Sequence, residues 1–494
     1  MRDIITVMVI ISRFYFKYKH GYYAELFKGF YSKVIFALLG KYCLPKGSDC
    51  LKAIIMAGGK GTRLRPICDL MPKPMTELLG KPLLAHLTEL LKKNGFSELC
   101  VTLGHQPICI TQYFGNGENF GVSMQYKIEK KPLGTAGGVR SCIDFVENQD
   151  FLVISGDAAC DFDLKYLASE HKRNGAMVTM ALYPHAEPLP YGTVLTDNSG
   201  RVINFIEKPS WERVVTDLVN TGIYMVSPKV LELIPEDTPY DFARDLFPLM
   251  AEKGYEIVGI PMQGYWCDIG NSKSYLNCCM DALDGKLKIT PAQKNSLSTG
   301  IYAPPNIPDS VRLIPPCVIC DGAVIERGAV IGHSVVHSFS RVGAYSRVIN
   351  SVIDHGNIAE ACIVNGTVVC RGAVLYPDTV TVKGDVVSPS GSSASPVSET
   401  KHTAKRRAQG LCREISCDNR ARLMREMSAV LWEAGADFTD GISLSDGKCK
   451  VRISPLPEES SISIEAIGGR ESERLQMCKK YSELAEKFGG KSIL

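Results

Sequence analysis

Between residues 51 and 290, short apolar runs alternate with longer segments in which apolar residues recur every three or four positions. The short runs predict buried strands, and the longer segments predict helices that cover them. The clearest helix is residues 81–94, which carry five leucines on one side. This alternation is typical of a parallel sheet with crossover helices, so we predict an α/β domain over residues 51–290. Strands are predicted at 52–57, 99–103, 151–154, 177–182 and 256–260.

Between residues 300 and 388 the helical pattern gives way to a repeat of six residues. Valine recurs at positions 318, 324, 330, 336, 342 and 348, and after a phase slip at 368, 374, 380 and 386. A valine-rich sandwich would alternate with a period of two, whereas a fixed period of six is typical of a parallel β-helix. We therefore predict a left-handed hexapeptide-repeat β-helix over 300–388, with these valines stacked inward.

The chain ends in a linker and a small domain. Residues 389–415 are rich in Ser and Pro and turn basic at Lys405, a composition that predicts a linker. Residues 416–490 predict a small α+β domain. Its helices are expected near 422–434 and 471–488, and its strands near 450–453 and 461–466.

Residues 1–50 hold eight Lys and Arg against three Asp and Glu, together with many aromatic residues. The apolar run at 4–11 is far shorter than the roughly 20 residues that span a bilayer, and no convincing cleavage site follows it. We predict a basic, aromatic extension and no transmembrane segment. Such a segment can rest on a membrane surface or have no role in the fold, and the sequence leaves both open.

The composition is that of an ordinary globular protein, with 45% hydrophobic and 22% charged residues among 494. The net charge of +3 gives no reason to expect a nucleic-acid-binding surface. Eighteen cysteines without regular spacing indicate reduced thiols and a cytoplasmic protein. Cys317 and Cys320 are spaced like metal ligands, but without a second pair we expect no zinc site there.

A glycine-rich loop follows the first predicted strand. Its residues include Ala57, Gly58, Gly59, Gly61 and Thr62. Glycines allow backbone N–H groups to converge on phosphate oxygens, although a loop of this kind can also be a structural turn. Arg63 inside the loop and Lys73 shortly after it add two cations, so this segment predicts a phosphate-binding site.

This loop, with Pro72, Lys73 and Pro74 after it, resembles the sugar-1-phosphate nucleotidyltransferase family, and the resemblance continues in order over roughly residues 52–285. It implies a Rossmann-like domain and an enzyme that joins a nucleoside triphosphate to a sugar 1-phosphate, releasing pyrophosphate. By resemblance, the nucleotide contacts are Ala57, Gly58, Gly59, Gly61, Thr62, Gly134, Thr135 and Ala136. The sugar-phosphate contacts are Tyr191, Gly192, Glu207, Lys208, Asn220 and Thr221. The implied catalytic residues are Arg63, Lys73 and Lys208, and the implied Mg²⁺ ligands are Asp157 and Asp268.

These residue types suit the implied reaction, in which the attacked α-phosphorus is shielded by negative oxygens. Mg²⁺ prefers carboxylate and phosphate oxygens as ligands. Arg63 and Lys73 would hold the triphosphate, while Lys208 would orient the sugar phosphate. Each residue also has a structural alternative: Asp157 could cap a strand end, and Tyr191 could serve packing.

Within the family, the sequence looks most like the mannose-1-phosphate guanylyltransferases, on the evidence of residues 133–139, Tyr224 and the segment 265–268. The implied reaction makes GDP-mannose from GTP and mannose 1-phosphate. Two alternatives remain. The substrates could be glucose 1-phosphate with UTP or dTTP, or the chain could be a non-catalytic regulatory paralogue. Intact cationic and acidic motif residues argue against the paralogue.

The last domain resembles the C-terminal domain of hexose phosphomutases, which bacterial proteins fuse to a guanylyltransferase and a β-helix. The mutase core is missing here, because 388–420 has no room for it. The usual phosphate-loop motif is replaced by residues 452–456, so no mutase activity is expected. Because β-helices commonly pack against one another, we also expect a homo-oligomer.

Overall fold

The computed structural model describes residues 51–389, 391–392, 411–457 and 459–492. The predicted extension at 1–50 and most of the predicted linker lie outside these residues. By their internal contacts, the described residues belong to one compact unit. Within the described residues, no helix combines the length and apolar character needed to cross a membrane.

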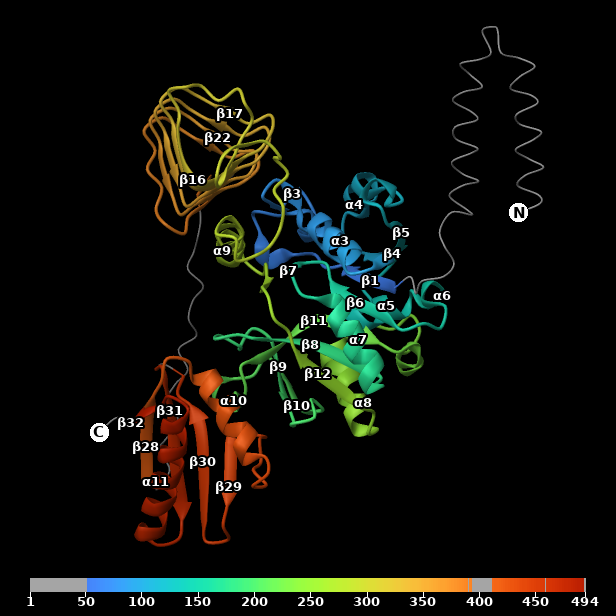
Figure 1. Cartoon of the computed structure of the whole chain (residues 1–494), viewed down its shortest axis with the longest axis vertical. Coiled ribbons are helices and arrows are strands. Elements are labelled where there is room, and N and C mark those ends of the chain that lie inside the picture. The colour runs from blue at the N-terminus through green and yellow to red at the C-terminus, as the bar shows by residue number, and fades with distance from the viewer. Residues whose placement is uncertain (1–50, 390, 393–410, 458, 493–494) are drawn as a thin grey trace, which may run out of the picture. The chain divides into compact units, whose positions relative to one another are not determined.

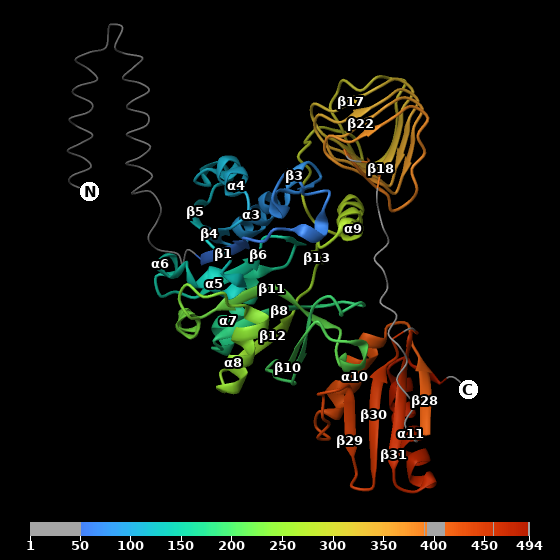
Figure 2. The ribbon, with the colours of Figure 1, turned by 180° about the vertical axis from the view of Figure 1, so that it is seen from behind.

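A mixed nine-stranded sheet forms the centre of the first domain. Its main path runs β10-β9-β11-β6-β1-β4-β5, and β8 and β12 extend it from β11. The strands are β1 (Leu51–Ala57), β4 (Phe96–Leu103), β5 (Ser123–Ile128), β6 (Phe151–Ser155), β8 (Val178–Pro184), β9 (Gly192–Thr196), β10 (Val202–Glu207), β11 (Leu218–Val226) and β12 (Ile257–Pro261). The predicted parallel pairing holds for β6, β1, β4 and β5, which lie side by side in Figures 1 and 2. By contrast, β11 runs antiparallel to β6.

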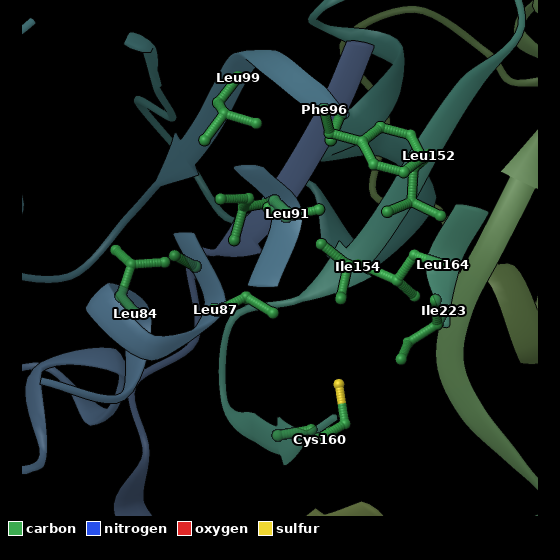
Figure 3. Close-up of a cluster of buried hydrophobic side chains, with 14 of the residues drawn as sticks. Leu84, Leu87, Leu91, Phe96, Leu99, Leu152, Ile154, Cys160, Leu164 and Ile223 are labelled. Carbon is green, nitrogen blue, oxygen red and sulfur yellow. The ribbon is translucent and has the colours of Figure 1, made fainter. Parts of the chain in front are cut away.

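Helices cover both faces of this sheet because alternate residues of its strands face opposite ways. Ala53 and Ile55 of β1 pack with α3 (Leu83–Lys93) and α7 (Leu164–Asn174), whereas Ile54 packs with α5 (Gly134–Arg140). Figure 3 shows the first of these cores, in which Leu84, Leu87 and Leu91 of α3 lie near Leu99, Leu152 and Ile154 of the sheet. The leucine stripe in the sequence is thus the buried face of α3.

The predicted helix at 81–94 begins two residues late. Lys81 and Pro82 form β3, which pairs with β2 (Glu77–Leu78), and Pro82 precedes the first helical residue. Pro suits this place because it has no backbone N–H, and the N–H groups at the start of a helix have no partner within the helix.

Short parallel strands follow the first domain. One ladder contains β15 (Ile301–Tyr302), β16 (Arg312–Ile319), β18 (Val330–Val336), β21 (Val352–Ile353), β24 (Val368–Val369) and β26 (Val386–Ser388). A second contains β17 (Val324–Ile325), β19 (Arg341–Val342), β22 (Asn357–Ile358) and β25 (Val374–Leu375), and β20 (Arg347–Ile349) joins β18 to β23 (Ile363–Asn365). Paired residues lie 16 to 18 positions apart, as with Val330 and Arg347. These ladders are compatible with a β-helix.

The prediction that every sixth valine points inward is wrong for seven of the ten. Val324, Val374 and Val380 are exposed, whereas the neighbours Ile325 and Leu375 are buried, and Val330 is only half-buried. Val318, Val368 and Val386 are buried, but in a cluster with α9 (Ser272–Leu283) and not in the core that the ladders share. The buried series runs Ile325, Ile331, Val336, Val342, Val348, Ile353, Ile358, Val364, Val369 and Leu375, with steps of five or six. A strict period of six drifts out of phase because paired residues lie 16, 17 or 18 positions apart, and only an offset of 18 is a multiple of six.

The last domain is a five-stranded antiparallel sheet covered by two helices. Its strand order is β29-β30-β31-β28-β32. Its elements are β28 (Leu411–Ser416), α10 (Arg420–Leu431), β29 (Ile442–Ser445), β30 (Cys449–Pro455), β31 (Ser461–Gly468), α11 (Glu471–Lys487) and β32 (Lys491–Ser492). The predicted boundary between the linker at 389–415 and the domain at 416–490 is wrong at β28. Strand pairing of 411–416 with β31 places these residues in the sheet.

Helix α10 packs against the segment that precedes β11. Ser428 Oγ donates to the Val215 carbonyl at 2.9 Å, and Arg425 Nε lies 3.1 Å from Asp217 Oδ1. Asp217 is buried, which raises the pKa of its carboxyl group, and Arg425 offsets this only in part. Removing Arg425 would therefore leave the buried Asp217 carboxylate without a neutralising partner.

Arg425→Ala should lower the free energy of unfolding by about 2 kcal/mol, because Asp217 would lose its cation while staying buried; partial exposure of Arg425 keeps the loss below that of a fully buried pair. Thermal or denaturant unfolding of the full chain measures this loss. Arg422→Ala, on an exposed position of the same helix, is the control. Equal unfolding free energies for the two variants would contradict the assigned role.

Candidate active site

Two aspartates from distant parts of the chain meet at one end of the central sheet. Asp157 follows β6 and immediately precedes β7 (Ala158–Cys160), and Asp268 ends β13 (Trp266–Asp268). The two short strands pair antiparallel, with Asp268 opposite Ala158. This pairing holds both carboxylates beside the carboxyl end of β6, where α/β sheets commonly bind ligands.

The ammonium group of Lys73 lies between these carboxylates. Its Nζ is 2.7 Å from Asp157 Oδ2 and 3.0 Å from Asp268 Oδ1. Burial of Lys73, which is 5% exposed, lowers its pKa, but the two aspartates outweigh burial and raise the pKa above its usual value. Lys73 therefore stays charged and balances part of the negative charge of the pair.

Asp157 remains ionised for the matching reason. Burial raises the pKa of its carboxyl group, but Lys73 and the Ser155 hydroxyl, which donates to Oδ1 at 2.6 Å, bring the pKa below its usual value. The Asp157 side chain is still 38% exposed. The carboxylate can thus reach a ligand in the adjacent cavity.

The glycine-rich loop packs directly on the Lys73 segment. Gly61 has φ 63°, and a Cβ there would lie 2.9 Å from the Lys73 Cβ, so a side chain is excluded both by backbone conformation and by contact. A Cβ at Gly59 would meet nothing within 4 Å. Gly61 therefore serves the fold, while the Gly59 side of the loop is open to a ligand.

A cavity of about 280 Å³ adjoins the two aspartates. Nine of the residues predicted from the sequence line it: Arg63, Thr135, Asp157, Tyr191, Gly192, Glu207, Asn220, Thr221 and Asp268. Ser155, Asp241 and Trp266 also line it, and the sequence analysis assigned none of these three a contact with a substrate. The cavity thus joins predicted residues from seven separate stretches of the sequence.

The remaining predicted residues lie around this cavity rather than in its lining. Lys73 contacts both aspartates, and Ala57, Gly58, Gly59, Gly61 and Thr62 belong to β1 and the loop after it. Lys208 is exposed at the end of β10, with φ 49°, and its N–H donates to the Tyr191 carbonyl. Within the described part of the chain, the Lys208 and Arg63 side chains form no hydrogen bond or ion pair, so both cations are available to a ligand.

The small residues of α5 have a structural partner. A Cβ on Gly134 would lie 2.6 Å from the Tyr240 carbonyl oxygen, and the Ala136 N–H donates to that same oxygen. The Thr135 hydroxyl donates to Asp241 Oδ2 at 2.8 Å and accepts the Phe242 N–H. The sequence analysis assigned these small residues to the nucleotide, whereas the contacts made within the chain are with the segment 240–242.

The residues assigned to the sugar also make contacts within the chain. The Tyr191 ring packs edge-on against Trp266 with centroids 5.2 Å apart, and burial raises the pKa of its hydroxyl to about 12, so it remains a donor. The Thr221 hydroxyl donates to the Ala181 carbonyl, which leaves its lone pairs for another partner. Burial raises the pKa of the Glu207 carboxyl group. Packing and ligand binding are therefore compatible at Tyr191.

Sequence reasoning missed Glu129, the residue after β5. Its Oε1 lies 3.0 Å from where a Gly58 Cβ would stand and 2.8 Å from a Gly138 Cβ, and its Oε2 accepts the Leu133 N–H at 3.1 Å. Burial raises the pKa of this carboxyl group. An acidic residue at a strand end, shortly before a glycine-rich helix start, was the signal in the sequence that could have identified it.

Comparison with known proteins places this geometry in a family. The family model described as nucleotidyl transferase matches residues 52–285. The UTP–glucose-1-phosphate uridylyltransferase of Synechocystis sp. is 33% identical over 343 residues, which cover 61% of this chain and 87% of the relative. The chain belongs to the nucleotidyl transferase family. The resemblance drawn from the sequence is thereby confirmed, together with the prediction of an enzyme.

Other relatives of this nucleotidyl transferase carry a second activity in their names. The mannose-1-phosphate guanylyltransferase of Mycobacterium tuberculosis is 30% identical over 314 residues, covering 63% of this chain and 82% of its own. The solved structure of HddC from Yersinia pseudotuberculosis is 27% identical and covers 47% of this chain and 99% of its own, with a TM-score of 0.42. The names of relatives thus include both a uridylyl and a guanylyl transfer.

Proposed function

We propose that this nucleotidyl transferase makes GDP-mannose from GTP and mannose 1-phosphate, releasing pyrophosphate. The observation that carries the reaction type is Lys73, whose ammonium is held between Asp157 and Asp268 beside a polar cavity. A buried cation between two carboxylates, with Arg63 at the same cavity, suits a reaction between two phosphate groups.

The two aspartates fit the Mg²⁺ ion that the family resemblance implies. They offer carboxylate oxygens, which are the ligands Mg²⁺ prefers, and Lys73 neutralises only part of their charge. When bound, the ion would neutralise phosphate charge and so favour attack on the α-phosphorus. Asp157 and Asp268 would hold it, and the Ser155 hydroxyl keeps the Asp157 carboxylate oriented.

The cations of the chain would divide between the two substrates. Arg63 lines the cavity next to the open Gly59 loop, so we assign it to the triphosphate. Lys73 lies outside that lining, and we assign it to the same phosphates through the positive charge that it adds beside Asp157 and Asp268. Lys208 follows Glu207 and donates its N–H to the Tyr191 carbonyl, so we assign it to the sugar phosphate, with Asn220 among the hydroxyl contacts. Holding both substrates in line removes much of the entropic barrier without a protein nucleophile.

The choice of GTP rests on Glu129. Its carboxylate stands beside Gly58 of the nucleotide loop and Gly138 of α5, the two segments assigned to the nucleotide. A carboxylate only accepts hydrogen bonds, and guanine presents two neighbouring donors, its N1–H and its 2-amino group. Uracil and thymine present one donor, N3–H, between two carbonyl acceptors, so one carboxylate oxygen would face a carbonyl oxygen instead of a donor. A uridylyltransferase with glucose 1-phosphate is the second candidate, favoured by the 87% coverage of the Synechocystis relative.

Pyrophosphate release should be fastest with GTP and mannose 1-phosphate when the full chain is supplied with Mg²⁺. The assay crosses GTP, UTP, dTTP and ATP with mannose 1-phosphate and glucose 1-phosphate. Turnover with a different pair would keep the reaction and reassign the substrates. A folded chain that releases no pyrophosphate with any pair would contradict the proposed function and favour a regulatory paralogue.

For the other domains, we infer that the parallel ladders form a left-handed β-helix, that the chain is a cytoplasmic homo-oligomer, and that the last domain is a binding or assembly module. The segment that replaces the mutase phosphate loop supports the last inference. Residues 452–455 lie within β30, with Arg452 paired to Glu465 of β31. A paired strand does not present its backbone N–H groups to a phosphate.

A further inference from the structure

Three side chains that suit a metal ion meet between the Lys73 segment and the parallel strands. Glu77 lies on β2, His337 follows β18, and His355 lies between β21 and β22. One ligand atom from each lies within 4.8 Å of the others. The proposed Mg²⁺ ligands Asp157 and Asp268 are not part of this cluster.

The spacing of the three groups leaves room for an ion rather than closing into direct hydrogen bonds. Glu77 Oε2 is 3.7 Å from His337 Nδ1, and Glu77 Oε1 is 3.9 Å from His355 Nε2. Two donors that each lie about 2.1 Å from a tetrahedral zinc ion are roughly 3.4 Å apart. The distance between Glu77 Oε1 and His355 Nε2 exceeds this by about half an ångström, which small side-chain movements can supply.

A buried carboxylate orients the two rings. Asp354, which is 4% exposed, places Oδ1 at 2.7 Å from His355 Nδ1 and 3.3 Å from His337 Nδ1. Histidine ligands commonly donate one ring N–H to a carboxylate, which fixes the ring and leaves the other nitrogen for the metal. In this arrangement Nδ1 of each ring donates to Asp354, so Nε2 of each ring is left for the metal, and Nε2 of His355 lies 3.9 Å from Glu77 Oε1.

His337 supplies an independent indication that a partner is missing. Its side chain is fully buried, and among the described residues its Nε2 has no hydrogen-bond partner. Leaving a buried polar nitrogen without a partner is costly. The backbone of Glu77 is also fixed, since the buried Tyr275 donates its hydroxyl to the Glu77 carbonyl at 2.9 Å.

Arg371 is the one charge in the cluster that opposes a cation. Its Nη2 lies 3.1 and 3.3 Å from the two ring nitrogens of His355, and 3.7 Å from Glu77 Oε1. A group almost equally far from both nitrogens does not lie along the lone pair of either one. Arg371 therefore leaves the Nε2 direction open, and the negative charges of Glu77 and Asp354 exceed its positive charge.

We propose that Glu77, His337 and His355 bind one zinc ion, with Asp354 orienting the imidazoles. Two nitrogens and a carboxylate oxygen are typical zinc ligands, whereas Mg²⁺ prefers oxygen ligands alone. The ion joins β2, four residues after Lys73, to the parallel strands that carry the histidines. Its function is to hold β2, and with it the adjoining segment that contains Lys73, against the parallel strands.

Metal analysis of the full chain tests the proposal without relying on activity. After removal of metals with a chelator, reconstitution with Zn²⁺ and dialysis, the chain should retain about one zinc ion, as expected for a single structural site. Co²⁺ in place of Zn²⁺ should give the visible absorption of a cobalt ion bound to protein nitrogen. Retention below about one tenth of an ion per chain would overturn the proposal.

His355→Asn should reduce zinc retention at least tenfold and abolish the cobalt absorption. His333→Asn is a matched control, because His333 also has a positive φ on the parallel strands but lies outside the cluster. Asp157→Asn provides a second test that leaves the cluster intact, and it should keep its zinc. Equal retention in His355→Asn and His333→Asn, or loss of zinc in Asp157→Asn, would overturn the assignment.

Discussion

Asp157→Asn should lower pyrophosphate release by about 10³-fold or more, because the amide removes a charge that the chain uses both to hold Lys73 and to bind a cation. The loss should appear in kcat with saturating substrates and should not be recovered by higher Mg²⁺. Because Asn has nearly the same shape as Asp, circular dichroism and thermal unfolding should show a folded chain.

The control for this substitution is Asp163→Asn. Asp163 caps α7 by accepting the Tyr166 N–H, a contact that an asparagine oxygen can also make. Its activity should equal that of the unmodified chain. A drop of less than tenfold for Asp157→Asn, with the control unchanged, would contradict the role assigned to the aspartate pair.

Glu129→Gln should move the nucleotide preference from GTP toward UTP and dTTP. The amide offers one acceptor and one donor, which match the N3–H and a neighbouring carbonyl of uracil or thymine better than the two donors of guanine. We expect kcat/KM with GTP to fall by about 10²-fold and kcat/KM with UTP to rise, since one mismatched pair of hydrogen bonds is worth roughly 1–3 kcal/mol. The ratio of the two values is the quantity to measure.

The ratio also separates base recognition from a general loss of function. Glu118→Gln, an exposed glutamate before β5, should leave the ratio unchanged. A parallel fall with all nucleotides in Glu129→Gln would show that Glu129 supports the loop at Gly58 without contacting the base. In that case the preference for GTP would need another source, while the proposed reaction would stand.

The sequence by itself determined which elements form and which motifs carry charge. The leucine stripe at 81–94 predicted the buried face of α3, because helical periodicity records burial directly. The order of motifs from Gly58 to Asp268 predicted the family, because phosphate chemistry restricts the residue types that can serve it. The six-residue repeat predicted parallel strands over the right region, but of its ten valines only Val336, Val342 and Val348 lie in the core that the ladders share.

Only the tertiary structure decided which of these residues meet. The contact of Lys73 with Asp157 and Asp268 depends on the pairing of β7 with β13, and no local pattern in either segment records its distant partner. The small residues of α5 face the chain segment 240–242, and the sequence could not distinguish this contact from contact with a ligand. The cluster of Glu77, His337 and His355 likewise appears only after folding. Sequence patterns encode local burial, whereas a site is assembled by long-range pairing that these patterns do not contain.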